Sequence, residues 1–238
     1  MRPKVYLFGD SITEFSFENG GWGAALANHF RCTADVVLRG YSGYNTRWAL
    51  RILDKAAFPA EECAGSPPLA VTVFFGANDA SLPDRSSAFQ HVPVDEYQNN
   101  LRSIVSFFKE RWPTVLVILL TPPPIDEAAR LLQPFGKNKS GLPERTNEAA
   151  GAYAKACIDV ASEFGVPSVD LWTKVQQVSD WKKTCLSDGL HLARAGNSVV
   201  FDEVVHVLKK QGRNAESLPS DFPIIDKDID PNDPLKSF

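Results

Sequence analysis

The sequence predicts a doubly wound α/β/α sandwich, in which helices cover both faces of a mostly parallel sheet. The first observation is that short, nearly all-apolar runs alternate with longer amphipathic stretches along most of the chain, a pattern typical of βαβ units. The second is that these runs are apolar at successive positions, as in strands that are buried on both faces. Right-handed crossovers between parallel strands then give the doubly wound arrangement.

Five short segments are expected to form the strands. They are residues 5–8, 35–38, 69–75, 115–120 and, as the shortest candidate, 168–171. The first four are dominated by Val, Leu, Ile and aromatic residues, which fit a buried strand. In an open parallel sheet, ligands bind beyond the carboxyl ends of the strands. The residues directly after each strand are therefore the candidates for chemistry.

Amphipathic stretches between and after the strands are expected to form helices. They are residues 22–30, 46–57, 94–112, 145–164 and about 193–210. In residues 94–112, apolar side chains recur at positions i, i+3 and i+4, which indicates one buried helical face. Pro113 ends that helix, and Gly165 is placed as the C-terminal cap of the next one.

Two connections are longer than the usual two to six residues of a βα loop. Residues 79–93 follow the third strand and residues 122–144 follow the fourth. Both lie at the carboxyl edge, where either could form a pocket wall or an ordinary surface loop. After Gly212 the composition changes to Asp and Pro. We therefore expect one domain over residues 1–211 and an extended tail over residues 212–238.

Composition and charge exclude several classes of protein. The chain carries 25 basic and 29 acidic residues without a stripe of Lys and Arg, which argues against a nucleic-acid partner. It has no apolar run long enough to span a membrane and no apolar stretch typical of a signal peptide. The scattered cysteines lack the spacing of a zinc site or a disulfide framework; they are Cys32, Cys63, Cys157 and Cys185. These features predict a cytoplasmic location and no membrane span.

A serine, a histidine and an aspartate lie in positions that suit nucleophilic catalysis. Ser11, in Gly9-Asp-Ser11, follows the first strand. A catalytic serine needs an imidazole that takes its proton and a carboxylate that orients the imidazole. Asp188-Gly-Leu-His191 brings both groups to one turn. His29 and His206 lie in helical patterns and His91 has no carboxylate at a suitable spacing, so His191 is the best candidate base.

Two further motifs could hold a developing oxyanion. Asn78, in Gly76-Ala-Asn-Asp79, follows the third strand, and a glycine-rich turn at residues 39–46 follows the second. A carboxamide and a glycine N–H can both donate hydrogen bonds to a tetrahedral oxyanion. Each motif alone is also consistent with an ordinary turn. Together, at one edge of the sheet, they complete the set of groups needed for acyl transfer.

In this order, the four motifs resemble those of the GDSL or SGNH hydrolases. The residues around them resemble the isoamyl acetate-hydrolysing esterase branch, which includes plant GDSL esterases. This likeness extends over nearly the whole chain; it includes residues 20–23, 39–50 and 120–124 and the Asp/Pro tail. The resemblance implies a flavodoxin-like α/β/α sandwich with a mostly five-stranded parallel sheet.

The resemblance also implies a role for each site residue. Ser11 would be the nucleophile, Asp188 the orienting acid and His191 the base. The oxyanion would be held by Ser11 N–H, Asn78 and a glycine. For that glycine Gly43 is preferred over Gly40, which lies too near the end of its strand. The implied enzyme is a serine esterase of short-chain, acetyl-type esters. Its substrate is a small-molecule ester, it uses no cofactor or metal, and a homodimer is compatible with the family.

Other functions compete with this prediction. A carbohydrate O-acetyl esterase or an acyltransferase could use the same groups on the same fold. Tyr41, Tyr44, Phe15 and Phe17 could form an apolar acyl wall or belong to the core. A non-enzymatic flavodoxin-like binding domain is much less well supported. Asp10 and Asp79 partly mimic the acidic cluster of a receiver domain, but the expected Lys is replaced by Thr121 and three prolines.

Overall fold

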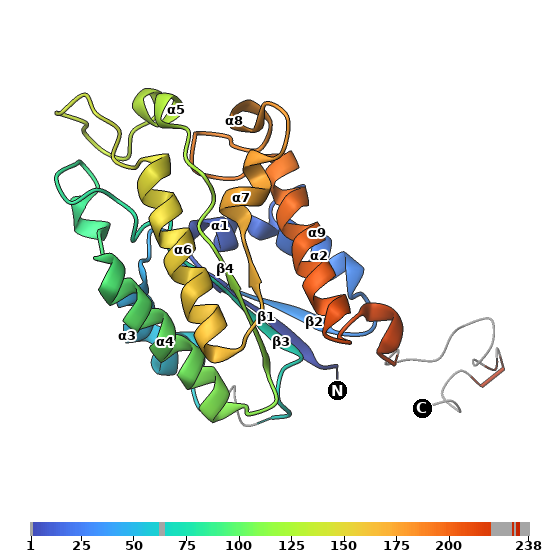
Figure 1. Cartoon of the computed structure of the whole chain (residues 1–238). Coiled ribbons are helices and arrows are strands. Elements are labelled where there is room, and N and C mark those ends of the chain that lie inside the picture. Colours follow the sequence, from blue (N-terminus) through green and yellow to red (C-terminus); the bar gives the residue numbers. More distant parts are fainter. Residues whose placement is uncertain (1, 62–64, 220–229, 231, 234–238) are drawn as a thin grey trace.

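In the computed structural model, five parallel strands form one sheet with the order β2-β1-β3-β4-β5 (Figure 1). The structure describes residues 2–61, 65–219, 230, 232 and 233. The strands are β1 (Lys4–Gly9), β2 (Asp35–Gly40), β3 (Ala70–Phe74), β4 (Leu116–Leu120) and β5 (Ser168–Val169). The predicted α/β class, the five strands and their parallel arrangement are confirmed.

The register aligns the carboxyl ends of the first four strands at the same edge of the sheet. Gly9 at the end of β1 pairs with Gly40 at the end of β2 and with Phe74 at the end of β3. Phe74 in turn pairs with Leu120 at the end of β4. The segments that follow these residues therefore emerge side by side at one edge of the sheet.

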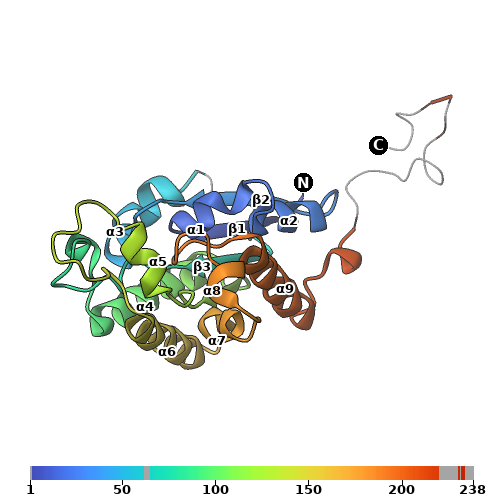
Figure 2. The same cartoon turned by 90° about the horizontal axis from the view of Figure 1, so that it is seen from above.

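Helices cover both faces of this sheet (Figures 1 and 2). The helices are α1 (Ser11–Glu14), α2 (Trp22–His29), α3 (Thr46–Ile52), α4 (Val94–Arg111), α5 (Glu127–Leu132), α6 (Asn147–Phe164), α7 (Leu171–Gln176), α8 (Trp181–Thr184) and α9 (Arg194–Lys210). Helices α3, α4 and α6 pack on one face, and α2 and α9 pack on the other.

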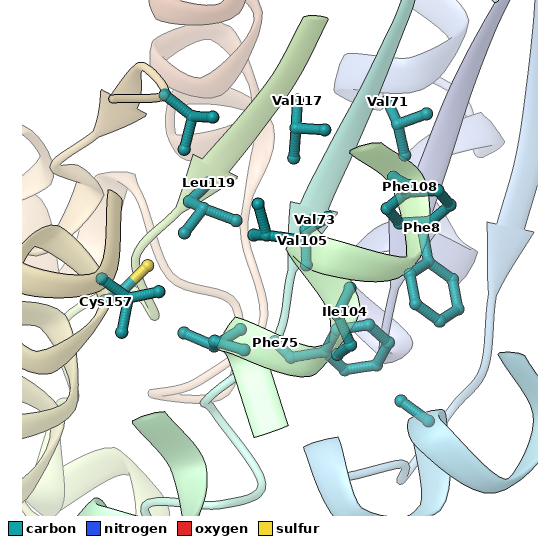
Figure 3. Packing of buried hydrophobic residues seen from close by; sticks show 14 of the residues in the cluster. Phe8, Val71, Val73, Phe75, Ile104, Val105, Phe108, Val117, Leu119 and Cys157 are labelled. Carbon is teal, nitrogen blue, oxygen red and sulfur yellow. The ribbon is translucent and has the colours of Figure 1, made fainter. Parts of the chain in front are cut away.

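The core consists of two layers because successive residues of a strand point to opposite faces. On β1, Phe8 faces α4, where its ring lies 4.8 Å from that of Phe75 and 6.1 Å from that of Phe108 (Figure 3). Leu7, its neighbour in sequence, joins the other cluster with Trp22 of α2. Both faces of the strands are thus apolar, which explains the absence of strict alternation in the sequence.

Local capping moves some element ends from their predicted positions. Thr146 accepts a hydrogen bond from the Ala149 N–H, so α6 begins at Asn147 and not at residue 145. Gly165 ends α6 in the left-handed region, at φ 60°, as expected. Strand β5 ends at Val169 because Asp170 already caps α7 through the Thr173 N–H. The expected helix 46–57 is α3 followed by a π-helical turn over Leu53–Ala57.

Both long connections lie at the carboxyl edge, and the second contains α5, which the sequence did not predict. Most of the expected tail lies outside the described residues, since 220–229, 231 and 234–238 are not described. Among the described cysteines, Cys32, Cys157 and Cys185 are free. Within the described ranges, every helix is too short or too polar to cross a bilayer.

Candidate active site

Ser11 begins α1, directly after the tight turn that ends β1. Gly9 is required in this turn, because a Cβ there would lie 2.1 Å from Thr13 Oγ1 and 2.6 Å from the Phe74 carbonyl. Asp10 caps α1 by accepting a hydrogen bond of 2.9 Å from the Ile12 N–H. The turn therefore holds the Ser11 side chain at the carboxyl edge of the sheet, where it is 6% exposed.

The structure brings Ser11, His191 and Asp188 into one hydrogen-bonded chain. Ser11 Oγ lies 2.9 Å from His191 Nε2, and His191 Nδ1 lies 2.8 Å from Asp188 Oδ2. The second carboxylate oxygen accepts bonds from the backbone N–H groups of Leu190 and His191. Gly189 makes the turn possible with a φ of +86°. The candidate nucleophile, base and acid are therefore within contact distance, although 180 residues separate Ser11 from His191.

The surroundings of Asp188 favour its ionised form. Burial alone would raise its pKa, but hydrogen bonds from the ring and backbone of His191 and from the Leu190 N–H hold the pKa well below the ordinary value. Arg130 adds a hydrogen bond of 2.9 Å to Oδ2. Because a carboxylate can only accept, the proton of a neutral His191 lies on Nδ1. Nε2 is then free to accept the proton of Ser11.

A cavity of about 220 Å³ opens in front of this chain. Ser11, His191, Gly43 and Asn78 all line it. Gly43 has a φ of +79°, a conformation that favours glycine. Within the described residues, neither the Ser11 N–H nor the Gly43 N–H has a hydrogen-bond partner. Two backbone donors and one carboxamide therefore converge on the cavity.

The alternative donor, Gly40, lies elsewhere. A Cβ on Gly40 would be 2.2 Å from the backbone nitrogen of Glu14, so its lack of a side chain lets β2 approach α1. It does not line the cavity in front of Ser11. Its position indicates a packing role.

Gln90 fixes both candidate oxyanion groups, and no sequence motif points to it. Its amide nitrogen donates to the Gly43 carbonyl at 2.9 Å and to Asn78 Oδ1 at 3.0 Å. Asn78 Nδ2 donates one hydrogen to the Tyr44 carbonyl at 2.9 Å. These bonds fix which end of the Asn78 carboxamide is the donor.

Behind the site lies a buried chain of charged side chains formed by Arg130, Glu144 and Arg145. Arg130 donates two bonds to Glu144 Oε1, at 2.6 and 2.8 Å, while it also holds Asp188. Arg145 donates to the same Glu144 oxygen at 3.2 Å and to Asn78 Oδ1 at 3.1 Å. The side chains of Arg130, Glu144 and Arg145 are only 4%, 0% and 2% exposed. Burial lowers the pKa of Arg145 to about 10. This chain joins the acid to the carboxamide.

Two buried aspartates flank the site. Burial raises the pKa of Asp10 and of Asp79 to about 7. Asp79 accepts bonds from the backbone N–H and the hydroxyl of Thr46, and so anchors the start of α3. Asp10 Oδ2 has no hydrogen-bond partner within the part of the chain that the structure describes.

The four aromatic residues considered for an acyl wall divide into two groups. Tyr41 and Tyr44 pack against the core cluster on the α4 face. Phe15 and Phe17 are 40% and 39% exposed, and only Phe15 lines the cavity in front of Ser11. Its ring lies 5.6 Å from that of His191. Phe15 is therefore the one member of the set at the site.

The chain is similar to known proteins over most of its length. A family model described as GDSL-like Lipase/Acylhydrolase matches residues 5–204. The chain is 63% identical to GDSL esterase/lipase At5g45920 of Arabidopsis thaliana, over 100% of this chain and 98% of that protein. It is 44% identical to the isoamyl acetate-hydrolyzing esterase 1 homolog of Rattus norvegicus, over 99% and 92% of the two chains.

Solved structures share the fold at low sequence identity. The lipase/acylhydrolase of Enterococcus faecalis aligns with a TM-score of 0.68 at 24% identity, over 94% of this chain and 100% of that one. Axe2, an acetylxylan esterase from Geobacillus stearothermophilus, aligns with a TM-score of 0.64 at 20% identity, over 87% and 94%.

Proposed function

Because the chain belongs to the GDSL-like lipase/acylhydrolase family and is a carboxylic ester hydrolase, we propose that it hydrolyses short-chain acyl esters through a Ser11–His191–Asp188 triad. The observation that carries this proposal is the continuous chain of hydrogen bonds from Ser11 Oγ through His191 to Asp188. The cavity lies directly beside it and is lined by Ser11 and Gly43, whose N–H groups have no hydrogen-bond partner among the residues that the structure describes.

In the first half of the reaction, Ser11 Oγ attacks the ester carbonyl carbon while its proton passes to His191 Nε2. The negative charge that develops on the carbonyl oxygen is stabilised by the N–H groups of Ser11 and Gly43 and by Asn78 Nδ2. The bond from carbonyl carbon to alcohol oxygen then breaks. The departing oxygen takes the proton from His191 Nε2 and leaves as the free alcohol, and the acyl group remains on Ser11.

In the second half, water replaces the alcohol. His191 Nε2 takes a proton from the water as its oxygen attacks the acyl carbon, and the same donors stabilise the second oxyanion. Breakage of the bond to Ser11 Oγ releases the carboxylic acid, and the proton on Nε2 returns to Ser11. Asp188 stays ionised and aligns the imidazole in both halves.

The size of the cavity supports a short acyl group. Its volume of about 220 Å³ is below the roughly 300–1,000 Å³ of typical ligand pockets. Pro134 and Phe135 from the second long connection line it together with polar groups. An acetyl group fits this restricted space better than a long fatty-acyl chain.

Ser11→Ala tests the mechanism. We expect this variant to lose p-nitrophenyl acetate hydrolysis by at least a thousandfold, since a triad without its nucleophile retains only transition-state binding. Ser103→Ala, which changes an exposed serine of α4, is the matched control. A fluorophosphonate probe should add mass to Ser11 alone. An active Ser11→Ala enzyme, or a probe on another residue, would contradict the assignment.

A profile of acyl lengths tests the substrate class. With p-nitrophenyl esters, we expect kcat/KM to be highest for acetyl or butyryl and to fall sharply at octanoyl, because the cavity cannot enclose the longer chain. A rate that rises up to octanoyl would refute the short-chain proposal and leave the triad intact.

A further inference from the structure

A second hollow lies beside the catalytic cavity. Its volume is about 310 Å³, and of the residues that line the cavity in front of Ser11, only Phe15 and His191 also line it. Its other walls come from α1, from the connection between α1 and α2, from the connection between α8 and α9, and from the start of α9. No step of the proposed reaction uses this hollow.

The geometry of the proposed reaction indicates which part of the ester occupies the second hollow. The carbonyl oxygen must point toward Gly43 and Asn78, which line only the catalytic cavity. The departing alcohol oxygen must take its proton from His191 Nε2, so it lies next to the imidazole. Because the imidazole borders both hollows, an alcohol attached to that oxygen can extend past Phe15 into the second one.

The walls of the second hollow offer both donors and acceptors. Glu18, Asn19 and Arg194 line it, and within the described ranges their side chains form no hydrogen bond or ion pair with the rest of the chain. A carboxylate accepts, a guanidinium donates and a carboxamide does both. The hydroxyl groups of a polyol or sugar match this mixture, whereas an alkyl alcohol could make no hydrogen bond to these three exposed side chains.

Hydrogen bonds and close packing fix the backbone around the second hollow. Asn197 of α9 accepts a hydrogen bond of 3.1 Å from the Trp22 N–H and donates to the carbonyls of Leu192 and Ala193. Gly21 packs so tightly that a Cβ would lie 2.2 Å from the Ser16 carbonyl oxygen. These contacts fix the start of α2 against the start of α9, so the site is formed before any alcohol binds.

We propose that the second hollow is the alcohol site of the esterase and that the alcohol it takes carries free hydroxyl groups, as in a partly acetylated sugar. This inference rests on the proposed function, since it assumes the acyl-enzyme on Ser11. It adds the class of the leaving group: Phe15 contacts the apolar face of the sugar, while Glu18, Asn19 and Arg194 bind its hydroxyls.

Two acetates that differ only in the alcohol test the proposal. We measure kcat/KM for monoacetylated xylose and for isoamyl acetate, and expect the native enzyme to prefer the xylose ester by about tenfold or more, the worth of one hydrogen bond to a charged group. Arg194→Leu should reduce this preference by about tenfold, and Asn19→Leu, which removes a neutral partner, by about two- to tenfold. Arg213→Leu makes the same chemical change beyond the other end of α9 and should leave the preference unchanged.

Inhibition by the free alcohols is a second measurement. Xylose should compete with the substrate, and Arg194→Leu should raise its inhibition constant by about tenfold. A native preference for isoamyl acetate, or a preference that neither variant changes, would overturn the alcohol site while hydrolysis that depends on Ser11 would still support the triad. If the native enzyme hydrolyses neither of these esters nor p-nitrophenyl acetate, both the alcohol site and the proposed function are wrong.

Discussion

Replacement of Arg130 by Met should destabilise the protein strongly, although Arg130 lies outside the triad. The guanidinium is buried, with its side chain 4% exposed, and it makes two bonds to a fully buried Glu144 and one to Asp188. Met keeps much of the volume and removes the charge. The change therefore leaves the buried carboxylate of Glu144 with Arg145 as its remaining cationic partner.

The size of the effect is set by these contacts. Loss of one partner from a buried ion pair costs about 3–5 kcal/mol. Arg145 still reaches Glu144 at 3.2 Å, so we expect the lower end, about 3 kcal/mol. For a chain of this length, 1 kcal/mol corresponds to roughly 2–4 °C. Arg130→Met should then lower Tm by about 6–12 °C.

Thermal unfolding measured by circular dichroism provides the assay. The matched control is Arg102→Met, which breaks a pair between Arg102 and Glu163 whose side chains are 35% and 50% exposed. Such pairs contribute only about 0–1 kcal/mol. If Arg130→Met lowered Tm by no more than Arg102→Met does, the stabilising role of the buried chain would be refuted.

The remaining predictions concern the site itself. Asp188→Asn should lower kcat for p-nitrophenyl acetate by about 10⁴-fold, because a carboxamide no longer selects the reactive tautomer of His191; a loss below tenfold would contradict this role. Asn78→Ala should lower kcat by about 10²–10³-fold with little change in KM, since the lost bond forms mainly in the transition state; equal changes in kcat and KM would argue against it. Asp10→Asn should alter how stability depends on pH. Burial raises the pKa of Asp10 from 3.8 to about 7, so the native protein gains stability from a protonated Asp10 below pH ~4 and loses it as pH rises through ~7. An asparagine does not titrate, so only the native protein loses this stability as the pH rises. The urea midpoint of the Asp10→Asn variant minus that of the native protein should therefore increase between pH 5 and pH 8. A difference that stays constant over this range would contradict the raised pKa of Asp10.

The sequence predicted those parts of the fold and site that depend on local pattern. Apolar runs identified the first four strands, because a strand buried on both faces must be apolar at successive positions. Ser11, Asn78, Asp188 and His191 could be predicted as site residues because each belongs to a short motif with its own turn residues. Their convergence was expected from the rule that strand ends share one edge.

The parts that the sequence did not predict depend on contacts between distant segments. Arg130 and Glu144 are 14 residues apart in sequence. Arg130 links Glu144 to Asp188 by donating a hydrogen bond to each carboxylate. No spacing rule distinguishes such a pair from exposed charges in a long loop. Gln90 is equally inconspicuous, since its role depends on Gly43 and Asn78 being folded beside it. The start of α6 was misplaced because Thr146, as a cap, outweighed the apolar pattern around it.

The alignment of Gly9, Gly40 and Phe74 across the sheet limits how this chain can change in length. Each residue inserted into a strand displaces the next segment of the chain by about 3.3 Å, so a single insertion in β1 would carry the nucleophile out of reach of both Gly43 and His191. Insertions at the opposite edge, for example between α4 and β4, leave the alignment of the carboxyl ends of the strands unchanged. Grafted segments and circular permutation should therefore be tolerated at that edge and abolish turnover when placed inside the strands.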